Sequence, residues 1–473
     1  MIEFIKMSHI DVTYSETSRS DITGSRNSSL EDFNLQLLHG EITFLIGLYG
    51  SGKRTVKEVL KGNIEGFNGI LYIDGIPCIG YNRSWAVKKG IITIDTNKSL
   101  VETLSVAENI FSIRRHKMFG LIFQRKVIYD QTKRLLSQVY MECNPSSPVY
   151  QLTEFQKQLL CIAKAISSGV SLLIIDCIYA SFSEPDLIIL KKIIIDLKRK
   201  GISCLIISDK PNELLRISDK AVIMKDGTDV KILENEEIQN KEVISYLLDG
   251  KLPYPLSNVP RAHILGIYDV FDALNEMLWS DSNYQGIINI LRKLPDGFFK
   301  KEELDSLDEW FKTQQAVFIP ENSYELLMWN MPLEDNLAVR DYKKLSDAGV
   351  INKGMLEYRK KEFYRRFNLD GSEEIEDLAH VYKKIITIFR WEFKKPKLLV
   401  LGNPIVNIDI LSSDVFKKYI FSLQEQGIRI VIISKSVFSI KQLCSQTYYL
   451  YQEELKMFKD KIDILELSAT QTE

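Results

Sequence analysis

The sequence lacks the features that mark several classes of protein. Its six cysteines include no CxxC pair and its five histidines show no metal-ligand spacing, so neither a disulfide framework nor a zinc site is expected. Most of the cysteines stand in apolar runs and are interpreted as reduced core residues. No apolar run approaches the roughly 20 residues that a membrane helix needs. The N-terminus has no basic segment followed by an apolar one, so no signal peptide is expected.

An excess of charge of one sign is also missing. The chain has 61 basic and 63 acidic residues, a net charge of -2, whereas binding several nucleic-acid phosphates needs a clustered basic excess. Nucleic acid is therefore not an expected partner.

An apolar content of 45% indicates a globular protein, and 473 residues are too many for one ordinary core. We expect a cytoplasmic protein of two or three domains, with any membrane link made through a partner.

The chain contains an internal repeat of strand-like and helix-like segments. Short apolar runs typical of buried parallel strands, L-L-I-I-D and L-L-V-L-G, are each preceded by an amphipathic stretch and followed by another strand-like run. Three matching pairs lie 226 residues apart: Leu152 and Leu378, Asp176 and Gly402, and Ser208 and Ser434. A fixed offset predicts a duplicated α/β domain, because chance similarity would let the spacing drift.

The domain boundary is expected near a turn-rich segment with three prolines, D-G-K-L-P-Y-P-L-S-N-V-P. We predict a first domain at residues 1–250, a linker at 251–261 and a second domain at 262–473. The polar stretch 15–29 is interpreted as a flexible loop inserted in the first domain.

A glycine-rich motif, G-L-Y-G-S-G-K-R-T, stands between a strand-like run and a helical stretch. Its glycines let backbone N–H groups surround phosphate oxygens, its lysine can reach the terminal phosphates, and the helix N-terminus adds its dipole. The predicted nucleotide-binding residues are Gly47, Gly50, Ser51, Gly52, Lys53, Arg54 and Thr55. Arg54 departs from the motif, which has a magnesium-binding Ser or Thr hydroxyl there. The alternative is a strand-to-helix turn kept only for folding.

Further segments resemble the ATPase subunits of ribose- and galactose-type sugar importers, which are single chains with two fused ATP-binding cassettes. The segments are 69–75, 104–111, 119–122 and 152–166 in the first half, and 319–322, 331–337 and 407–410 in the second. This resemblance covers nearly the whole chain. It implies an α/β fold of two tandem P-loop cassettes, each a mainly parallel sheet with helices plus a helical subdomain. It also implies ATP or ADP, with magnesium, as the ligand.

The resemblance assigns roles to residues of the first cassette. It places Tyr14 against the adenine, Lys53 at the phosphates, and Asp176 as the residue that would hold the water shell of magnesium. Asp176 fits equally well as a strand-end aspartate that caps the next turn. Other positions depart from the family: Cys177 replaces the catalytic glutamate, Asp209 the switch histidine, Thr96 the loop glutamine and Phe155 the signature glycine.

The second cassette departs further from the family pattern. The strand-like A-H-I-L-G-I is followed by no phosphate loop, and Gly402 and Asn403 replace the aspartate and glutamate. Val381 stands in the signature segment and Lys435 at the switch position. In the family each phosphate loop faces the other cassette's signature, so neither composite site would be complete. Loss of a general base alone typically removes about 10²–10⁴-fold of rate.

These residues predict a protein that binds ATP or ADP at the first cassette with weak or no hydrolysis. One alternative is a functional transport ATPase that energises sugar uptake, and another is a nucleotide-free regulatory or scaffold protein. The expected partners are membrane permease subunits, with the protein cytoplasmic or peripheral at the inner face of the cell membrane. In the family the neighbourhood of the basic run 114–117 is close to the permease contact, although a solvated surface is the usual interpretation of such a run.

Overall fold

The structure is a computed structural model. It describes residues 2–13, 29–64, 66–94, 100–111, 125–176, 182–234, 237–247, 264–268, 284–294, 297–321, 323–339, 346–347, 350–371, 375–376, 378–406, 408–435, 440, 443–444, 446–451 and 454–457. By its internal contacts the chain divides into two compact units. Unit 1 comprises Met1–Ala180 and Asp186–Leu252, and unit 2 comprises Ser181–Pro185 and Pro253–Glu473.

Unit 1 contains an antiparallel sheet in the order β2-β1-β4-β5. Its strands are β1 (Glu3–Val12), β2 (Leu30–Leu38), β4 (Asn68–Ile73) and β5 (Ile76–Pro77). Apolar residues at alternating positions of β1 and β2 are buried because one face of the sheet packs on the core. The same core contains Val56 and Leu60, so this layer packs against helix α1 (Lys53–Leu60).

The second sheet of unit 1 has the order β10-β9-β3-β8-β7-β6. Its strands are β3 (Ile42–Gly47), β6 (Ile91–Ile94), β7 (Leu172–Asp176), β8 (Ser203–Ser208), β9 (Lys220–Lys225) and β10 (Thr228–Glu234). Strands β3 and β8 are buried along their whole length, as expected of parallel strands covered on both faces. Since β8 pairs in parallel with β3 on one side and with β7 on the other, the carboxyl ends of these three strands meet at one edge of the sheet.

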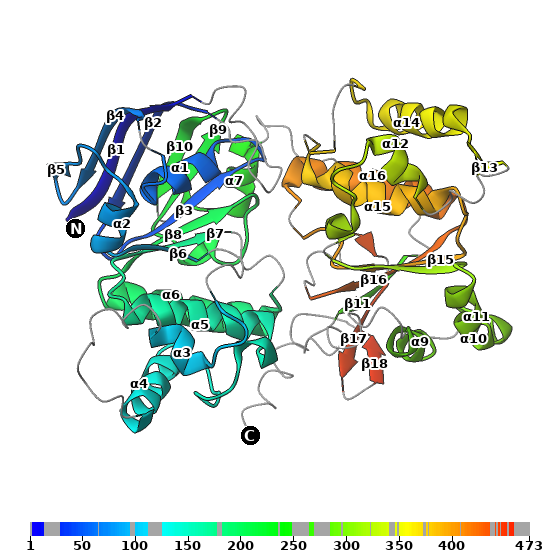
Figure 1. Cartoon of the computed structure of the whole chain (residues 1–473), viewed down its shortest axis with the longest axis horizontal. Helices are drawn as coiled ribbons and strands as arrows, with labels where there is room; N and C mark the ends of the chain where they lie inside the picture. Colours follow the sequence, from blue (N-terminus) through cyan, green and yellow to red (C-terminus); the bar gives the residue numbers. More distant parts are fainter. Residues whose placement is uncertain are drawn as a thin grey trace. The chain divides into compact units, whose positions relative to one another are not determined.

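Helices cover both faces of this parallel sheet. Besides α1, the helices of unit 1 are α2 (Arg83–Lys88), α3 (Val106–Phe111), α4 (Arg125–Ser137), α5 (Glu154–Ser167), α6 (Glu184–Arg199) and α7 (Asn240–Leu247). Of these, α3 and α4 pack against α5. Figure 1 shows α5 and α6 below β6, β7 and β8, on the side opposite α1.

Unit 2 repeats the strand order of that sheet. Its order β12-β15-β16-β11-β17-β18 matches β6-β7-β8-β3-β9-β10 strand for strand. The strands are β11 (Ile264–Tyr268), β12 (Ala316–Ile319), β15 (Leu398–Gly402), β16 (Arg429–Ser434), β17 (Gln446–Tyr451) and β18 (Glu454–Met457). The offset of 226 residues extends to the last two pairs, since Lys220 corresponds to Gln446 and Thr228 to Glu454. The predicted fold class, two tandem α/β cassettes, is confirmed.

Two apolar clusters lie on opposite faces of the unit 2 sheet. Ile264 and Tyr268 of β11 pack with the first cluster, which includes α15 (His380–Glu392) and α16 (Ile410–Glu425). Leu265 and Ile267 pack with the second, as strand alternation requires. The other helices are α9 (Gln285–Leu291), α10 (Lys301–Asp305), α11 (Leu307–Lys312), α12 (Leu333–Ala338) and α14 (Lys353–Phe367). The second cluster includes residues of α9 and α11, which Figure 1 shows below the sheet. A small hairpin pairs β13 (Ser346–Asp347) with β14 (Val350–Ile351).

The two units also share a buried asparagine with the same hydrogen bonds. Asn109 of α3 accepts from Val101 N at 2.8 Å and donates to three carbonyl oxygens of the preceding loop. Asn336 of α12 accepts from Met328 N at 2.8 Å and donates to three carbonyls at the same sequence distances. Both side chains are fully buried. Each asparagine therefore fixes the loop that leads into its helix.

The cysteines among the described residues form no disulfide with one another, and Cys161, Cys204 and Cys444 are buried. Burial raises the pKa of Cys204 to about 12, and it also raises the pKa of Cys78 and of Cys143. Thiols with raised pKa values are poor nucleophiles at neutral pH. Among the described residues no helix is both long and apolar enough to cross a lipid bilayer.

Candidate functional site

The glycine-rich loop at residues 47–52 joins the end of β3 to the start of α1. Gly50 and Gly52 have φ angles of 81° and 99°, in the left-handed region that favours glycine. A Cβ on Gly47 would lie 2.3 Å from Ser51 Oγ and 2.6 Å from the Met224 carbonyl oxygen. The glycines of the motif are therefore needed for the loop conformation itself, whether or not a ligand binds.

The loop is held by the turn between β9 and β10. Gly227 N donates to Ser51 O at 3.1 Å, and Ser51 N donates to Leu48 O at 3.1 Å. Ser51 and Thr55 are buried, whereas Arg54 is half-buried. This hydrogen bonding positions the residues at the start of α1 beside the carboxyl ends of the neighbouring strands.

Lys53 is the first residue of α1, and only 8% of its side chain is exposed. Its Nζ donates to Gly47 O at 2.7 Å, to Leu48 O at 2.9 Å and to Ser51 Oγ at 3.3 Å. It also forms an ion pair with Asp209, with Oδ1 at 2.9 Å. An ammonium group has three donors, so a phosphate oxygen that approaches Lys53 must replace one of these acceptors.

A second ion pair links α1 to β7. Lys57 Nζ lies 2.5 Å from Oδ2 of Asp176, the last residue of that strand, and the two side chains are 10% and 24% exposed. Lys57 comes four residues after Lys53 and so shares its face of the helix. The two predicted residues Asp176 and Asp209 are thus each paired with a lysine of α1. Lys57 was not among the residues predicted from the sequence, although its spacing of four from Lys53 was a signal for it.

Several predicted site residues lie outside the described residues. They are Tyr14, Thr96 and Cys177, and the segment 114–117 also lies there. Their roles remain predictions.

The signature segment of unit 1 forms the start of α5. Thr153 is the N-cap residue: its side chain accepts from Gln156 N at 3.2 Å, while Gln156 Oε1 accepts from Thr153 N at 3.0 Å. This capping box satisfies two N-terminal donors of the helix from within the chain. Phe155, at the glycine position of the family signature, is half-buried.

In unit 2, residues at the edge formed by the carboxyl ends of the sheet strands are joined by hydrogen bonds. Asn403 directly follows β15 and donates from Nδ2 to Glu321 Oε2 at 2.6 Å. Its Oδ1 accepts from Lys435 N at 3.0 Å. Gly402 brings no carboxylate to this edge, and Val381 is buried in the core cluster. Asn403 therefore links the two positions that the sequence predicts to correspond to the family's catalytic glutamate and switch histidine.

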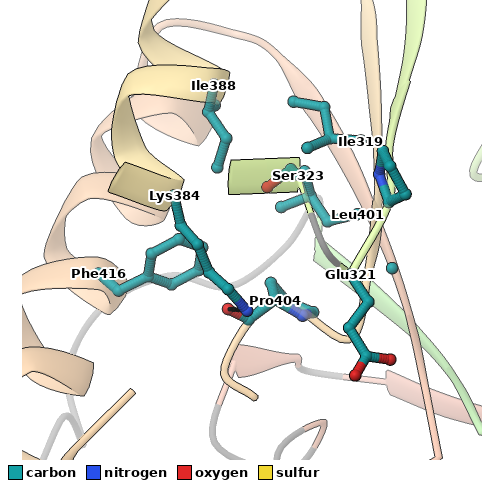
Figure 2. Close-up of a pocket in the computed structure, with 10 residues that line it drawn as sticks. Ile319, Glu321, Ser323, Lys384, Ile388, Leu401, Pro404 and Phe416 are labelled. Atoms are coloured by element: carbon teal, nitrogen blue, oxygen red, sulfur yellow. Dashed lines mark hydrogen bonds between the residues drawn. The ribbon is translucent and has the colours of Figure 1, made fainter. Parts of the chain in front are cut away.

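A small cavity lies beside this edge of unit 2 and is shown in Figure 2. Buried Lys384 extends to Pro404 across it and donates from Nζ to Pro404 O at 3.3 Å and to Val406 O at 2.6 Å. The cavity has about 10 Å³ of volume, enough for about one water molecule. It is too small for a nucleotide.

Comparison with known proteins finds relatives that match most of the chain. The family model described as "ABC transporter" matches residues 30–177, from β2 to the end of β7. The xylose import ATP-binding protein XylG of Thermoanaerobacter pseudethanolicus is 25% identical over 452 residues, covering 86% of this chain and 88% of the relative. The ribose import ATP-binding protein RbsA of Caldanaerobacter subterraneus is 25% identical over 456 residues, covering 90% and 92%. A solved ATP-binding cassette of an ABC transporter matches with a TM-score of 0.46 and 19% identity, covering 54% of this chain and 100% of that one.

The chain thus carries an ABC transporter domain in its first half. Along most of its length it is similar to ATP-binding proteins of xylose and ribose import. The predicted family resemblance is confirmed.

Proposed function

We propose that unit 1 binds ATP or ADP on the loop at residues 47–55, with Lys53 at the phosphates and Tyr14 near the base. The observation that supports this proposal is the strand–loop–helix geometry of the motif, in which a buried lysine lies among the loop carbonyls. The backbone N–H groups of the loop and the N-terminus of α1 are suited to bind phosphate oxygens.

The proposed hydrolysis is slow or absent. Cys177 stands where the family has its general base, and Asp209 stands at the switch position, where its carboxylate is paired with Lys53. A negative carboxylate beside the phosphate lysine opposes the charge that develops on a transferring phosphoryl group. Loss of the base removes roughly 10²–10⁴-fold of rate on its own.

Unit 2 is proposed to contribute packing or docking rather than nucleotide chemistry. Its sequence has no phosphate loop after β11, and Asn403 and Lys384 are engaged in hydrogen bonds along the edge where nucleotide chemistry would take place. Its strand order is nevertheless intact. The fold of the second cassette is thus retained without the groups for hydrolysis.

The relatives point to a role beside a membrane permease. They are named as ATP-binding proteins of xylose and ribose import. We propose that this chain acts in the same way, as a cytoplasmic subunit at the inner face of the membrane that associates with permease subunits of a sugar importer.

Two measurements on purified protein test binding and hydrolysis. A fluorescent ADP analogue is titrated against the wild type, Lys53→Ala and the control Lys61→Ala, and phosphate release from ATP is followed in parallel. Lys61 lies at the end of the same helix and pairs with Glu58 at 3.1 Å, so its loss should leave binding unchanged. We expect Lys53→Ala to weaken binding clearly and the wild type to release little phosphate. Equal binding by all three proteins would contradict nucleotide binding at the loop, and rapid release would contradict weak hydrolysis.

A further inference from the structure

The residues around Asp176 do not fit the magnesium ion that the family resemblance implies. Magnesium prefers oxygen ligands in a nearly octahedral arrangement. Here Asp176 Oδ2 lies 2.5 Å from an ammonium group, and Arg54 stands where a hydroxyl ligand would be. Within the described part of the chain no group of three or more His, Cys, Asp or Glu side chains is placed to hold a metal ion.

Lys57 supplies positive charge at the position where a metal would neutralise Asp176. Both side chains are largely buried, so the pair is only weakly screened by solvent. Without a cation there, the carboxylate would repel a phosphate group on the loop. Lys57 already neutralises Asp176 in the protein without a ligand, and so it removes that repulsion.

The start of α1 is rich in positive charge. Lys53, Arg54 and Lys57 lie within its first five residues, and its first turn has no acidic residue. Glu58, the acidic residue that follows, is paired with Lys61 at 3.1 Å. Lys53 and Lys57 neutralise Asp209 and Asp176, so neither aspartate faces the loop as a carboxylate without a cation beside it.

We infer that unit 1 binds a nucleoside di- or triphosphate as the metal-free anion, with Lys57 providing at Asp176 the charge that magnesium provides in a metal-dependent site. This inference rests on the proposed nucleotide binding and specifies the form of the ligand. It also agrees with slow hydrolysis, because a site without the metal lacks its stabilisation of the developing phosphate charge.

The test compares binding of the fluorescent ADP analogue to the whole chain in EDTA and in magnesium. For the wild type we expect dissociation constants that agree within about twofold in the two buffers, since the charge balance needs no metal. Lys57→Met keeps an unbranched side chain of similar length but leaves Asp176 unneutralised. We expect it to weaken binding in EDTA by about tenfold or more, with magnesium recovering part of the loss.

Two further variants identify the cause of that loss. Lys61→Met removes a lysine from the same helix without touching Asp176, and its binding should match the wild type in both buffers. The double variant Lys57→Met/Asp176→Asn removes both charges of the pair, so it should recover binding in EDTA relative to Lys57→Met. The double variant also leaves no buried carboxylate without a cation beside it. Its binding can therefore still be compared with that of the wild type if Lys57→Met folds poorly.

The outcomes separate this inference from the proposed function. Wild-type binding that requires magnesium would overturn the metal-free site while nucleotide binding itself stands. No binding in either buffer, or equal binding by the wild type and Lys53→Ala, would overturn both. A double variant that binds as weakly as Lys57→Met in EDTA would show that charge neutralisation at Asp176 is not the role of Lys57.

Discussion

Replacing Asp209 with asparagine should strengthen nucleotide binding by unit 1. In the structure its Oδ1 lies 2.9 Å from Lys53 Nζ, and the side chain is 31% exposed. A phosphate oxygen on the same ammonium would come within roughly 5 Å of the carboxylate. At an effective dielectric constant of about 20 the repulsion between two unit charges at that distance is about 3 kcal/mol.

The measurable effect should be smaller than this upper value, because the carboxylate is partly exposed and solvent screens it. A gain of about 1–2 kcal/mol corresponds to roughly 5- to 30-fold tighter binding. The variant Asp209→Asn keeps the size of the side chain and removes its charge. It should therefore change the electrostatics of the site more than its packing.

The assay is titration of the fluorescent ADP analogue against the wild type, Asp209→Asn, Lys53→Ala and the double variant. This cycle separates the repulsion felt directly by the phosphate from the release of Lys53 from its ion pair. Asp74→Asn is the matched control, because it removes a carboxylate paired with Lys89 at 2.9 Å in the antiparallel sheet region, away from the loop. Binding by Asp209→Asn that is equal to or weaker than the wild type would refute the reasoning.

Two further predictions concern stability and hydrolysis. Asn109→Ala and Asn336→Ala should each lower the free energy of unfolding by about 2–4 kcal/mol, because buried backbone groups lose their partners, whereas exposed Asn63→Ala should change it by less than about 0.5 kcal/mol. Chemical denaturation measures this, and a loss below about 1 kcal/mol in both asparagine variants would contradict it. Cys177→Glu alone should not produce a working ATPase, because groups that act as a unit are strongly non-additive. A large rise in phosphate release by this variant would show a better assembled site than we propose.

The sequence by itself was enough to predict the repeated α/β fold. Runs such as L-L-I-I-D and L-L-V-L-G mark buried parallel strands because these strands are covered on both faces, and apolar composition is a local property of the chain. The glycine motif could be recognised in the sequence for a similar reason, because Gly50 and Gly52 are needed for a local backbone conformation. The duplicated asparagines were also visible in the sequence, but only their buried hydrogen bonds show what they do.

The partners of the charged residues depended on the tertiary structure. Lys57 and Asp176 are 119 residues apart in the chain, and they meet because α1 packs beside the carboxyl end of β7. Lys53 meets Asp209 because β8 ends beside β3 in the parallel sheet. No local pattern encodes such pairs, since strand order in the sheet differs from order in the sequence. The sequence identified Asp209 as a departure from the family. The packing of α1 on the sheet decided that Asp209 pairs with Lys53 and that Asp176 pairs with Lys57.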